Sequence, residues 1–231
     1  AGACLAVGLR FAGTSDPAAK RLLLARLKAF RDARRSTAQP AQMASLPTPG
    51  MDLDRSTLET CQSVVAVSLG MVMAGTGDLA SLCLLRSLRK KADLETNYGV
   101  HSATHMAIGF LFLGGGRYTF NQDPLSTATL LMAAFPRFPV SLNDNRCHLQ
   151  AFRHLYALAA RHRAIEAVEV DTRRPVDVSV LVGTSQGMEP EATTLPRLLL
   201  AAGEVQSISL QSKRYWPVTI SRAPDGTPAA R

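Results

Sequence analysis

The stretch SLGMVMAGTGD, residues 68–78, decides the fold because related stretches occur at two other places in the chain. It aligns with AVGLRFAGTSD (6–16) and with AIGFLFLGGGR (107–117), which starts 39 residues after it. In each copy one glycine lies within an apolar helical run, and a second glycine follows five residues later. The six glycines are Gly8, Gly13, Gly70, Gly75, Gly109 and Gly114. A period of about 40 residues is the span of one helical hairpin, so the pattern predicts a stack of helix pairs.

Each recurring position has a physical role. An interior glycine costs a helix about 1 kcal/mol relative to alanine, so we expect the first glycine of each copy to allow close approach of a neighbouring helix. The second glycine suits the left-handed conformation at the C′ position that ends a helix. An acid follows, and Asp16, Asp78 and Asp123 are expected to cap the second helix of each pair. Pro17 and Pro124 then stand at the first helical position, where a missing N–H costs nothing.

The helical repeats are predicted to cover residues 1–164. A run rich in Pro, Ser, Thr and Ala at 36–52 marks a loop of about 36–56 inserted into the first repeat. CHLQAFRHLYALAARH (147–162) has helical spacing without the glycines and is interpreted as an atypical further helix. The fold class is therefore mostly α, an α-solenoid of helix pairs.

A small β-rich unit is predicted for residues 165–221. Alternating apolar residues indicate strands at 165–171, 176–182, 205–210 and 215–220. Residues 222–231 are expected to be a mobile tail or the point where a longer chain was cut. The chain starts without Met inside an apolar run, and we interpret it as a fragment of a longer polypeptide.

The net charge of +8 raises the question of an acidic partner. Much of the excess lies in KRLLLARLKAFRDARR (20–35), an amphipathic basic helix that we interpret as the solvated face of a packed helix, with a functional basic patch as the alternative. The four cysteines form no C-x-x-C pair and are interpreted as buried thiols in a reducing compartment. The charge-free run 96–116 contains Asn97, His101, Ser102, His105 and five glycines, so we do not expect it to span a membrane.

Three patterns that could carry chemistry lack the rest of their motifs. GTSQG (183–187) matches G-x-S-x-G, but no histidine follows His162, so Ser185 has no triad partner in the required order. His101 and His105 share a helix face without the glutamate of H-E-x-x-H or an evident third ligand. The glycines at 114–116 fit neither a dinucleotide-binding nor a P-loop motif. We therefore expect no catalytic, cofactor-binding or metal-binding residues.

The loop GGGRYTFNQD (114–123) is six residues longer than its two counterparts. The added residues include Arg117, Tyr118 and Phe120, and arginine and tyrosine are frequent hot-spot residues at protein interfaces. These three residues are candidate partner contacts. The alternative is a loop packed onto its own protein.

The AGTSD and AGTGD turns resemble the proteasome/cyclosome (PC) repeat family of scaffold subunits. Longer stretches resemble, within it, the family of the largest subunits of the anaphase-promoting complex. These stretches are LETCQSVVAVSLGMVMAGTGDL (58–79), NYGVHSATHMAIGFLFLGGGRYT (97–119), DNRCHLQAFRHLYALAA (144–160), VDTRRP (170–175) and KRYW (213–216). The loop at 36–52 and the MEPEATT region (188–194) have no match in the family pattern.

The resemblance implies that the repeats form part of a closed toroid in a non-catalytic scaffold of a multisubunit ubiquitin ligase acting in mitosis. It implies partners among the other subunits: the Doc-homology substrate receptor, the cullin-like and RING subunits, and the platform subunits. It implies neither a cofactor nor a membrane, and a location in the nucleus and cytoplasm.

Three alternatives stay open at this point. One is a PC-repeat scaffold of the proteasome regulatory particle. Another is a basic helical-repeat protein that binds nucleic acid through residues 20–35, whose binding would weaken steeply between about 50 and 200 mM salt. The last is a serine hydrolase, which a fluorophosphonate probe would label at Ser185.

Overall fold

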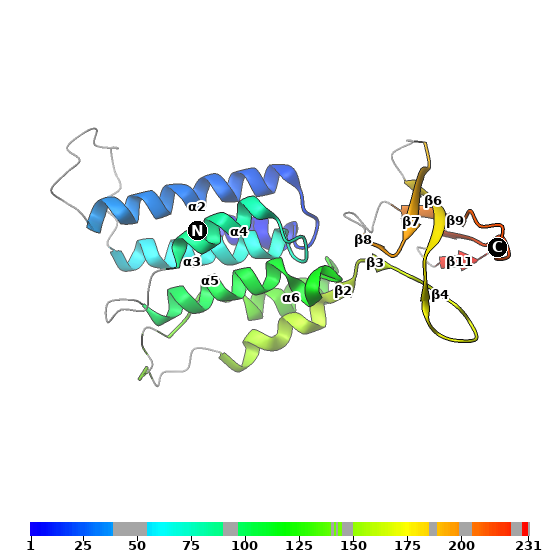
Figure 1. The fold of residues 1–231 in the computed structure, drawn as a ribbon. Helices are drawn as coiled ribbons and strands as arrows, with labels where there is room; N and C mark the ends of the chain where they lie inside the picture. Colours follow the sequence, from blue (N-terminus) through cyan, green and yellow to red (C-terminus); the bar gives the residue numbers. More distant parts are fainter. Residues whose placement is uncertain are drawn as a thin grey trace. The chain divides into compact units, whose positions relative to one another are not determined.

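The computed structural model describes residues 1–38, 55–89, 97–139, 141, 143–144, 150–184, 189–198, 205–222 and 228–230. The chain divides into two compact units, Ala1–Arg161 and His162–Arg231. The first unit is helical and the second is built of antiparallel strands (Figure 1). The sequence patterns predict this boundary three residues later, between residues 164 and 165.

The helices of the first unit lie where the sequence predicts them. The first two expected pairs are present, but the second helix of the third expected pair lies on the opposite face of the unit. The helices are α1 (Gly2–Arg10), α2 (Pro17–Ala38), α3 (Arg55–Val72), α4 (Leu79–Leu88), α5 (Tyr98–Leu111) and α6 (Pro124–Ala133). Two 3₁₀ helices, η1 (Leu113–Gly116) and η2 (Gln150–Ala159), and the paired strands β1 (Tyr118–Phe120) and β2 (Ala160–His162) complete the unit.

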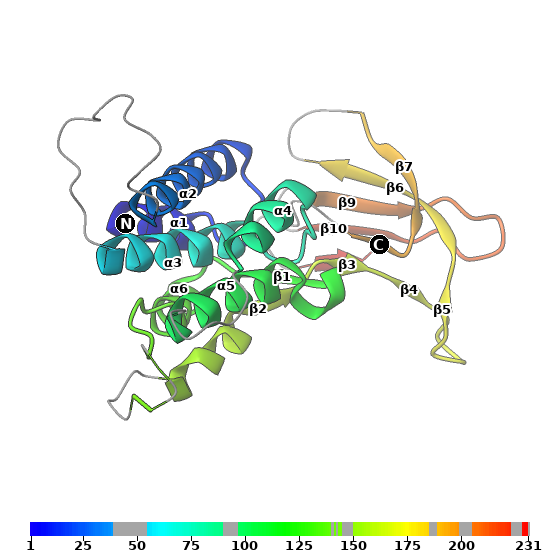
Figure 2. The same cartoon turned by 60° about the vertical axis from the view of Figure 1, so that its left-hand side comes forward.

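The helical unit is organised around one central layer. In this layer α3 packs between α1 and α5. One face is covered by α2 and α4, whose leucines, Leu23, Leu27 and Leu85 among them, are fully buried against it. The other face is covered by α6 and η2 around Phe110 and Phe120. Figures 1 and 2 show α2, α3 and α5 running side by side.

Two glycines set the spacing within the central layer. A methyl group on Gly8 would lie 2.7 Å from Ser68 Cβ, and one on Gly70 would lie 2.7 Å from the carbonyl oxygen of Ala107. Both distances are shorter than a carbon atom tolerates, so only glycine permits these helices to lie where they do. Ser68 and Ala107 are the same position of the repeated stretch, two residues before its first glycine. The two helix contacts therefore have the same register.

Gly109 does not have this packing role within the described residues, contrary to the expectation. A methyl group on Gly109 would meet no atom within 4 Å, and the residue is exposed. The reason is the path of the chain: the segment after α5 leads to the opposite face of the central layer, and no described helix lies beside Gly109.

The second unit contains one main sheet of order β11-β10-β9-β6-β7 in which all neighbours are antiparallel. Its strands are β6 (Val178–Thr184), β7 (Glu191–Leu195), β9 (Val205–Leu210), β10 (Thr219–Arg222) and β11 (Pro228–Ala230). Residues Val178, Val180 and Val182 of β6, which lies between β9 and β7, alternate toward a small buried core. Two short pairs accompany the sheet: β3 (Ala164–Ile165) with β8 (Arg197–Leu198), and β4 (Ala167–Val168) with β5 (Pro175–Val176).

Several predicted boundaries are wrong. Helix α2 continues to Ala38 and α3 begins at Arg55, so the ends of the expected inserted loop are helical, while residues 39–54 lie outside the described part. The expected helix at 147–162 is a 3₁₀ helix over 150–159, and its last residues form β2. Strand β7 lies where no strand is predicted, and β11, which falls inside the expected mobile tail, pairs with β10.

The glycine contact can be tested by a matched pair of substitutions in two helix interiors. Gly70→Ala should lower the free energy of unfolding by about 1–3 kcal/mol, because the new methyl group overlaps the Ala107 backbone. Gly109→Ala should raise it by about 0.5–1 kcal/mol, because alanine is the better helix former and the site is open. Urea unfolding followed by far-UV circular dichroism measures both. Changes of the same sign and size would show that the α3–α5 contact does not depend on glycine.

Candidate interaction edge of the helical unit

The turns that follow α1 and α3 have the same geometry. Gly13 and Gly75 have φ angles of 69° and 74°, which favour glycine. Each lies three residues past the last helical residue, one position beyond the expected C′ site. The hydroxyl of Thr14 donates to the carbonyl of Phe11 at 2.8 Å and accepts the Asp16 N–H at 3.2 Å. Thr76 makes the same two bonds, to Met73 and from Asp78, with the same distances.

The three acids stand at the starts of the second helices. The carboxylate of Asp16 accepts the N–H of Ala19 at 2.7 Å, that of Asp78 accepts the N–H of Ser81 at 2.9 Å, and that of Asp123 accepts the N–H of Ser126 at 2.9 Å. These bonds satisfy amide groups that would otherwise lack a partner in the first helical turn. Asp78 also accepts from Lys20 of α2 at 2.6 Å and so joins α2 to α4.

The electrostatics of Asp78 favour its charged form. Burial by itself would raise its pKa, but the hydrogen bonds from Lys20 and Ser81 and the positive charge of Lys20 outweigh burial. The pKa of Asp78 therefore lies below its usual value of 3.8.

Each turn also hydrogen-bonds to the end of the next helix of the central layer. Gly13 donates its N–H to Met71 at 2.8 Å, and two residues later Ser15 donates to Val72 at 3.1 Å. The turn after α3 repeats this: Gly75 donates to Phe110 and Gly77 donates to Leu111, both at 2.9 Å. The C-terminal ends of α1, α3 and α5 therefore lie at one edge of the unit. We call this the turn edge and define it as residues 13–16, 75–78 and 114–123.

The third turn lacks two side chains of the other two, since Arg117 stands where Asp16 and Asp78 stand and a glycine replaces the threonine. Gly115 stands where Thr14 and Thr76 stand, so the side-chain hydroxyl that closes the first two turns is missing. Gly114, Gly115 and Gly116 all have positive φ angles of 56°, 65° and 88°. The chain therefore leaves α5 in another direction and runs along the turn edge.

This crossing segment, residues 117–122, contacts the ends of all three central helices. The Thr119 hydroxyl lies 3.1 Å from the carbonyl oxygens of both Gly13 and Ala74. The Gln122 amide donates to the carbonyl of Arg10 at the end of α1 at 3.1 Å. The added length of this loop thus carries the chain from α5 past α3 to α1, where α6 begins.

The expectation that Phe120 contacts a partner is wrong. Its side chain is 0% exposed and packs edge-on against Phe110 with ring centroids 5.0 Å apart. Tyr118 is half-buried and packs against the same core, while Arg117 is exposed. The loop is packed onto its own protein, and of the three candidates only Arg117 has an exposed side chain.

Arg153 of η2 fixes the end of α6, and no motif predicted it. Its guanidinium donates to the carbonyls of Ala133 at 2.9 Å, Phe135 at 2.5 Å and Arg137 at 2.6 Å. It also lies 3.9 Å from the ring centroid of Phe138. Burial lowers the pKa of Arg153 to about 10, so the group stays charged at neutral pH and faces the negative end of the α6 dipole. The signal available in the sequence was an arginine on the apolar side of an amphipathic segment.

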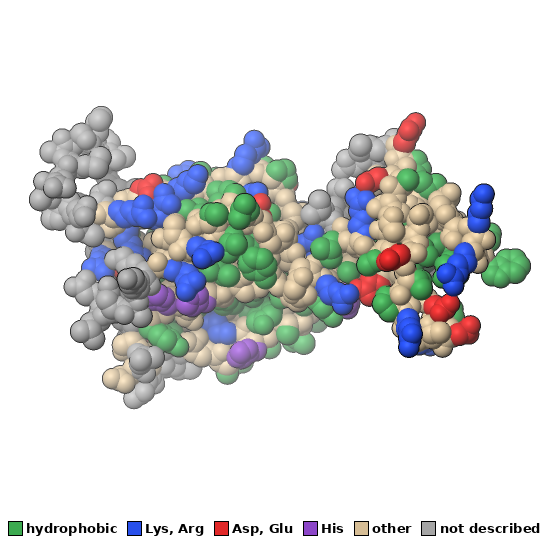
Figure 3. All heavy atoms as spheres, in the orientation of Figure 1, with side chains coloured by type: hydrophobic (Ala, Val, Ile, Leu, Met, Phe, Trp, Pro, Cys, Tyr) green, Lys and Arg blue, Asp and Glu red, His purple; other side chains and the backbone are tan. Residues whose placement is uncertain are grey.

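Positive charge is concentrated in the helical unit. Residues 1–161 hold 18 Lys and Arg against 10 Asp and Glu, which is the whole net charge of +8, and residues 162–231 hold eight of each. Lys and Arg side chains gather over α2 (Figure 3). Within α2, Lys20 pairs with Asp78 and Arg31 with Asp32, while Arg21, Arg26, Lys28 and Arg35 are exposed. The buried side of α2 is apolar, which fits the expected solvated outer face.

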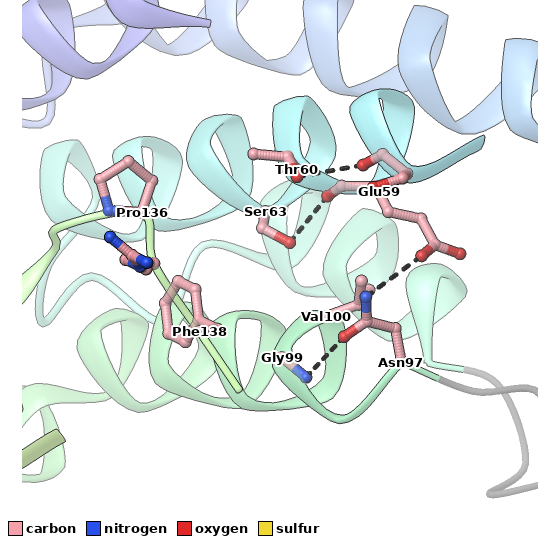
Figure 4. A pocket seen from close by; sticks show the side chains of 10 residues that line it. Glu59, Thr60, Ser63, Asn97, Gly99, Val100, Pro136 and Phe138 are labelled. Atoms are coloured by element: carbon pink, nitrogen blue, oxygen red, sulfur yellow. Dashed lines mark hydrogen bonds between the residues drawn. The ribbon is translucent and has the colours of Figure 1, made fainter. Parts of the chain in front are cut away.

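A polar pocket of about 240 Å³ lies between the starts of α3 and α5 and the segment after α6 (Figure 4). Its most buried acid, Glu59, lies 3.3 Å from the Arg55 guanidinium and 3.8 Å from that of Arg34, and it accepts from Asn97 at 3.4 Å. The Ser63 hydroxyl donates to the Glu59 carbonyl at 2.8 Å. The polar groups of the pocket thus bond to one another and join the helices, and none is set up as a nucleophile with a base.

The remaining candidate residues do not come together in the described part of the chain. The rings of His101 and His105 lie 5.8 Å apart, and burial, followed by the charges of Arg89 and His101, lowers the pKa of His105. No cluster of three or more His, Cys, Asp or Glu side chains occurs among the described residues. Ser185 and Cys147 lie outside them.

Cys4 and Cys61 are half-buried, but Cys83 is exposed, contrary to the expected burial. None of the described helices has the length and apolar character needed to cross a bilayer.

Comparison with known proteins assigns the chain to a family. Residues 1–161, the whole helical unit, match the family model described as the APC1 fifth domain. The chain belongs to the anaphase-promoting complex subunit 1 family. It is 44% identical over 225 residues to anaphase-promoting complex subunit 1 of Homo sapiens, a match that covers 95% of this chain and 11% of the human protein. The Dictyostelium discoideum subunit 1 is 40% identical over 227 residues, covering 96% of this chain and 10% of that protein.

A further relative is the protein named "Negative regulator of mitosis" of Emericella nidulans. It is 43% identical over 233 residues, which cover the full chain and 11% of the relative. The chain thus spans about a tenth of the length of these relatives. The family match includes the turn edge and the crossing segment in one block.

The role of Arg153 can be tested by Arg153→Lys. Lysine keeps the charge but cannot reach three carbonyls with a planar fork, so we expect the free energy of unfolding to fall by about 2–4 kcal/mol. The control is Arg137→Lys, because the Arg137 side chain is exposed and only its carbonyl takes part. Equal urea midpoints for Arg153→Lys and the unaltered chain would contradict the assigned role.

The ion pair between Lys20 and Asp78 predicts a dependence on pH. Because the pKa of Asp78 is lowered in the folded state, its contribution is present above pH 3.8 and is lost as the pH falls below 3.8 through the folded-state pKa. Asp78→Asn keeps a helix cap but removes the charge, so this part of the acid sensitivity should disappear. The melting temperatures of the unaltered chain and of Asp78→Asn, measured from neutral to acid pH, test this. If both melting temperatures fall with pH by the same amount, the result argues against the ion pair.

Proposed function

We propose that this chain is part of a non-catalytic scaffold subunit of the anaphase-promoting complex, a multisubunit ubiquitin ligase. The observation that carries the proposal is the repeated register of the turn edge: α1 meets α3, and α3 meets α5, through the same glycine contact and the same two hydrogen bonds. A contact that repeats in this way can be extended by adding further units, which is the property that a scaffold needs.

The helix pairs are in this proposal repeats of the PC type within a solenoid that closes into a toroid. The pairs are α1 with α2 and α3 with α4, and α5 is the first helix of a third unit. The alternative of a proteasome regulatory-particle scaffold has the same type of repeat but is not the family that the chain matches.

The exposed face of α5 is the proposed site for a further helix. Gly109 stands there in the position of Gly8 and Gly70, and Tyr98 of the same helix and Phe112 directly after it are exposed. Among the described residues, no hydrogen bond runs from Gly114 or Gly116 to a further helix, although Gly13, Ser15, Gly75 and Gly77 each make one. A further helix would fit against Gly109 if it had a small residue at the position that Ser68 and Ala107 occupy in the repeated stretch. Its last carbonyls could then accept the N–H groups of Gly114 and Gly116.

The partners in this proposal are proteins. They are the other subunits of the complex, among them the Doc-homology substrate receptor, the cullin-like and RING subunits and the platform subunits. The proposal places the chain in the nucleus and cytoplasm, and it requires neither a cofactor nor a membrane. Nucleic acid is not a proposed partner, since the exposed cations of α2 are the outer face of a helix packed on apolar residues.

The proposal is tested by Gly109→Leu in the full-length subunit. The side chain has room in the chain described here, so the melting temperature of the 231-residue chain should not fall, but a helix packed against α5 would be displaced. We expect the full-length variant to co-purify with fewer of the other subunits, measured by quantitative mass spectrometry. Ala80→Leu, at an exposed position of α4, is the matched control. Unchanged subunit stoichiometry with Gly109→Leu would refute the proposed use of this face.

A further inference from the structure

The loop between β9 and β10 presents a tryptophan to solvent. Trp216 is 88% exposed and is the single tryptophan of the chain. An indole ring is the largest apolar side chain, and tryptophan, tyrosine and arginine are the residues most enriched among interface hot spots. An outward tryptophan beside Arg214 and Tyr215 therefore needs a physical explanation.

The loop that carries Trp216 is held in place at its base and by its neighbour. Leu210 donates its N–H to the Val218 carbonyl at 2.9 Å, and Gln211 donates to the Ser179 carbonyl of β6 at 2.8 Å. Tyr215 packs against the valine-rich core of the sheet. Because Tyr215 is anchored in the core, the backbone at Trp216 is fixed and the indole ring points into solvent. A fixed backbone reduces the conformational entropy that is lost when a partner buries the indole.

The apolar face of the sheet extends to the residues that follow Trp216 in the chain. Ile220 of β10 lies directly opposite Ile208 of β9, which packs against Val180 and Val182. Ile220 and Val218 are each 42% exposed, so the apolar face of the sheet extends into solvent on the β10 side. We call Trp216, Val218 and Ile220, with Lys213 and Arg214, the Trp216 patch.

The charge at the border of the patch has one sign. Lys213 and Arg214 are exposed, and residues 211–218 contain no Asp or Glu. Neither cation forms an ion pair among the described residues, and the Arg214 guanidinium lies 5.5 Å from the Tyr215 ring centroid. Binding of a partner surface to the patch would be favoured if that surface had carboxylates beside its own apolar centre.

A protein fits this patch better than a lipid surface or nucleic acid. Both of those are anionic and are held mainly by several clustered cations, whereas this unit has eight basic and eight acidic residues and the patch has two cations. A mixed patch with one aromatic anchor and a charged border is the composition of a protein interface centre and its rim.

We propose that the Trp216 patch binds another protein subunit, which offers an apolar pocket for the indole ring with carboxylates beside it. This goes beyond the proposed function of the helical unit and relies on it only for the assembled complex in which it is measured.

The test uses the full-length subunit in the reconstituted complex, with a photoreactive benzoylphenylalanine in place of Trp216. The control carries the same group in place of Val170, which is 83% exposed in the turn between β4 and β5. After irradiation, we expect position 216 to give at least about tenfold more cross-link to another subunit than position 170, as for a buried hot spot. The cross-linked peptide should contain apolar residues with Asp or Glu close by.

A second variant tests the charged border. Lys213→Glu with Arg214→Glu should reduce the cross-link from position 216 by at least about threefold, because carboxylates would then face carboxylates. Trp216→Ala should leave the melting temperature of the 231-residue chain unchanged, since the side chain is exposed, whereas Tyr215→Ala should lower it.

Three results would overturn the proposal. The first is that position 216 cross-links only to the subunit's own polypeptide. The second is that the cross-link yield from position 216 is no higher than that from position 170. The third is a blue shift of Trp216 fluorescence when the chain is mixed with phosphatidylserine vesicles. Co-purification of the other subunits is measured in the same samples, so an intact complex without the cross-link rejects this inference and leaves the scaffold proposal standing.

Discussion

The close approach of helix backbones at Gly8 and Gly70 is the constraint on which the rest of the helical unit depends. It brings α1, α3 and α5 near enough for the turn after one helix to donate to the last carbonyls of the next. A side chain at either glycine would separate the helices and break those bonds together. The helix spacing, the turn hydrogen bonds and the capped second helices are thus one coupled arrangement, in which the leucines of α2 and α4 fill the space that the central layer leaves.

A second arrangement, built from different residues, covers the other face of the same layer. The crossing segment carries the chain along the turn edge, Phe120 is buried beside Phe110, and Arg153 gathers the carbonyls at the end of α6. Contacts between residues far apart in the sequence stabilise this second face. Contacts between successive copies of the repeated stretch stabilise the first face. The family match covers both faces, which places them in one structural unit.

What could be predicted from the sequence follows the same division. The helix pairs and the capping positions of Asp16, Asp78 and Asp123 depend on nearby residues, so periodicity and spacing were enough to predict them. The burial of Phe120 could not be predicted, because it depends on where the chain goes after α5, which spacing does not contain. Arg153 was missed because its partners are backbone carbonyls, which every sequence has. Strand β7 pairs with β6 through EATTL, whose composition has no apolar alternation.

Two exchanges in the turns distinguish the two paths that the chain takes: glycine at 115 replaces threonine at 14 and 76, and arginine at 117 replaces aspartate at 16 and 78. Where the threonine hydroxyl is present, the turn closes and the next helix of the central layer lies beside the one before it. Where it is missing, the chain after α5 runs along the turn edge past α3 to α1. The returning segment leaves the exposed face of α5 beside Gly109 uncovered within the described residues, so the change of direction after α5 does not block a further helix there. A contact that has the same register between successive helices can be lengthened by duplication of a whole unit without the need for a new kind of contact.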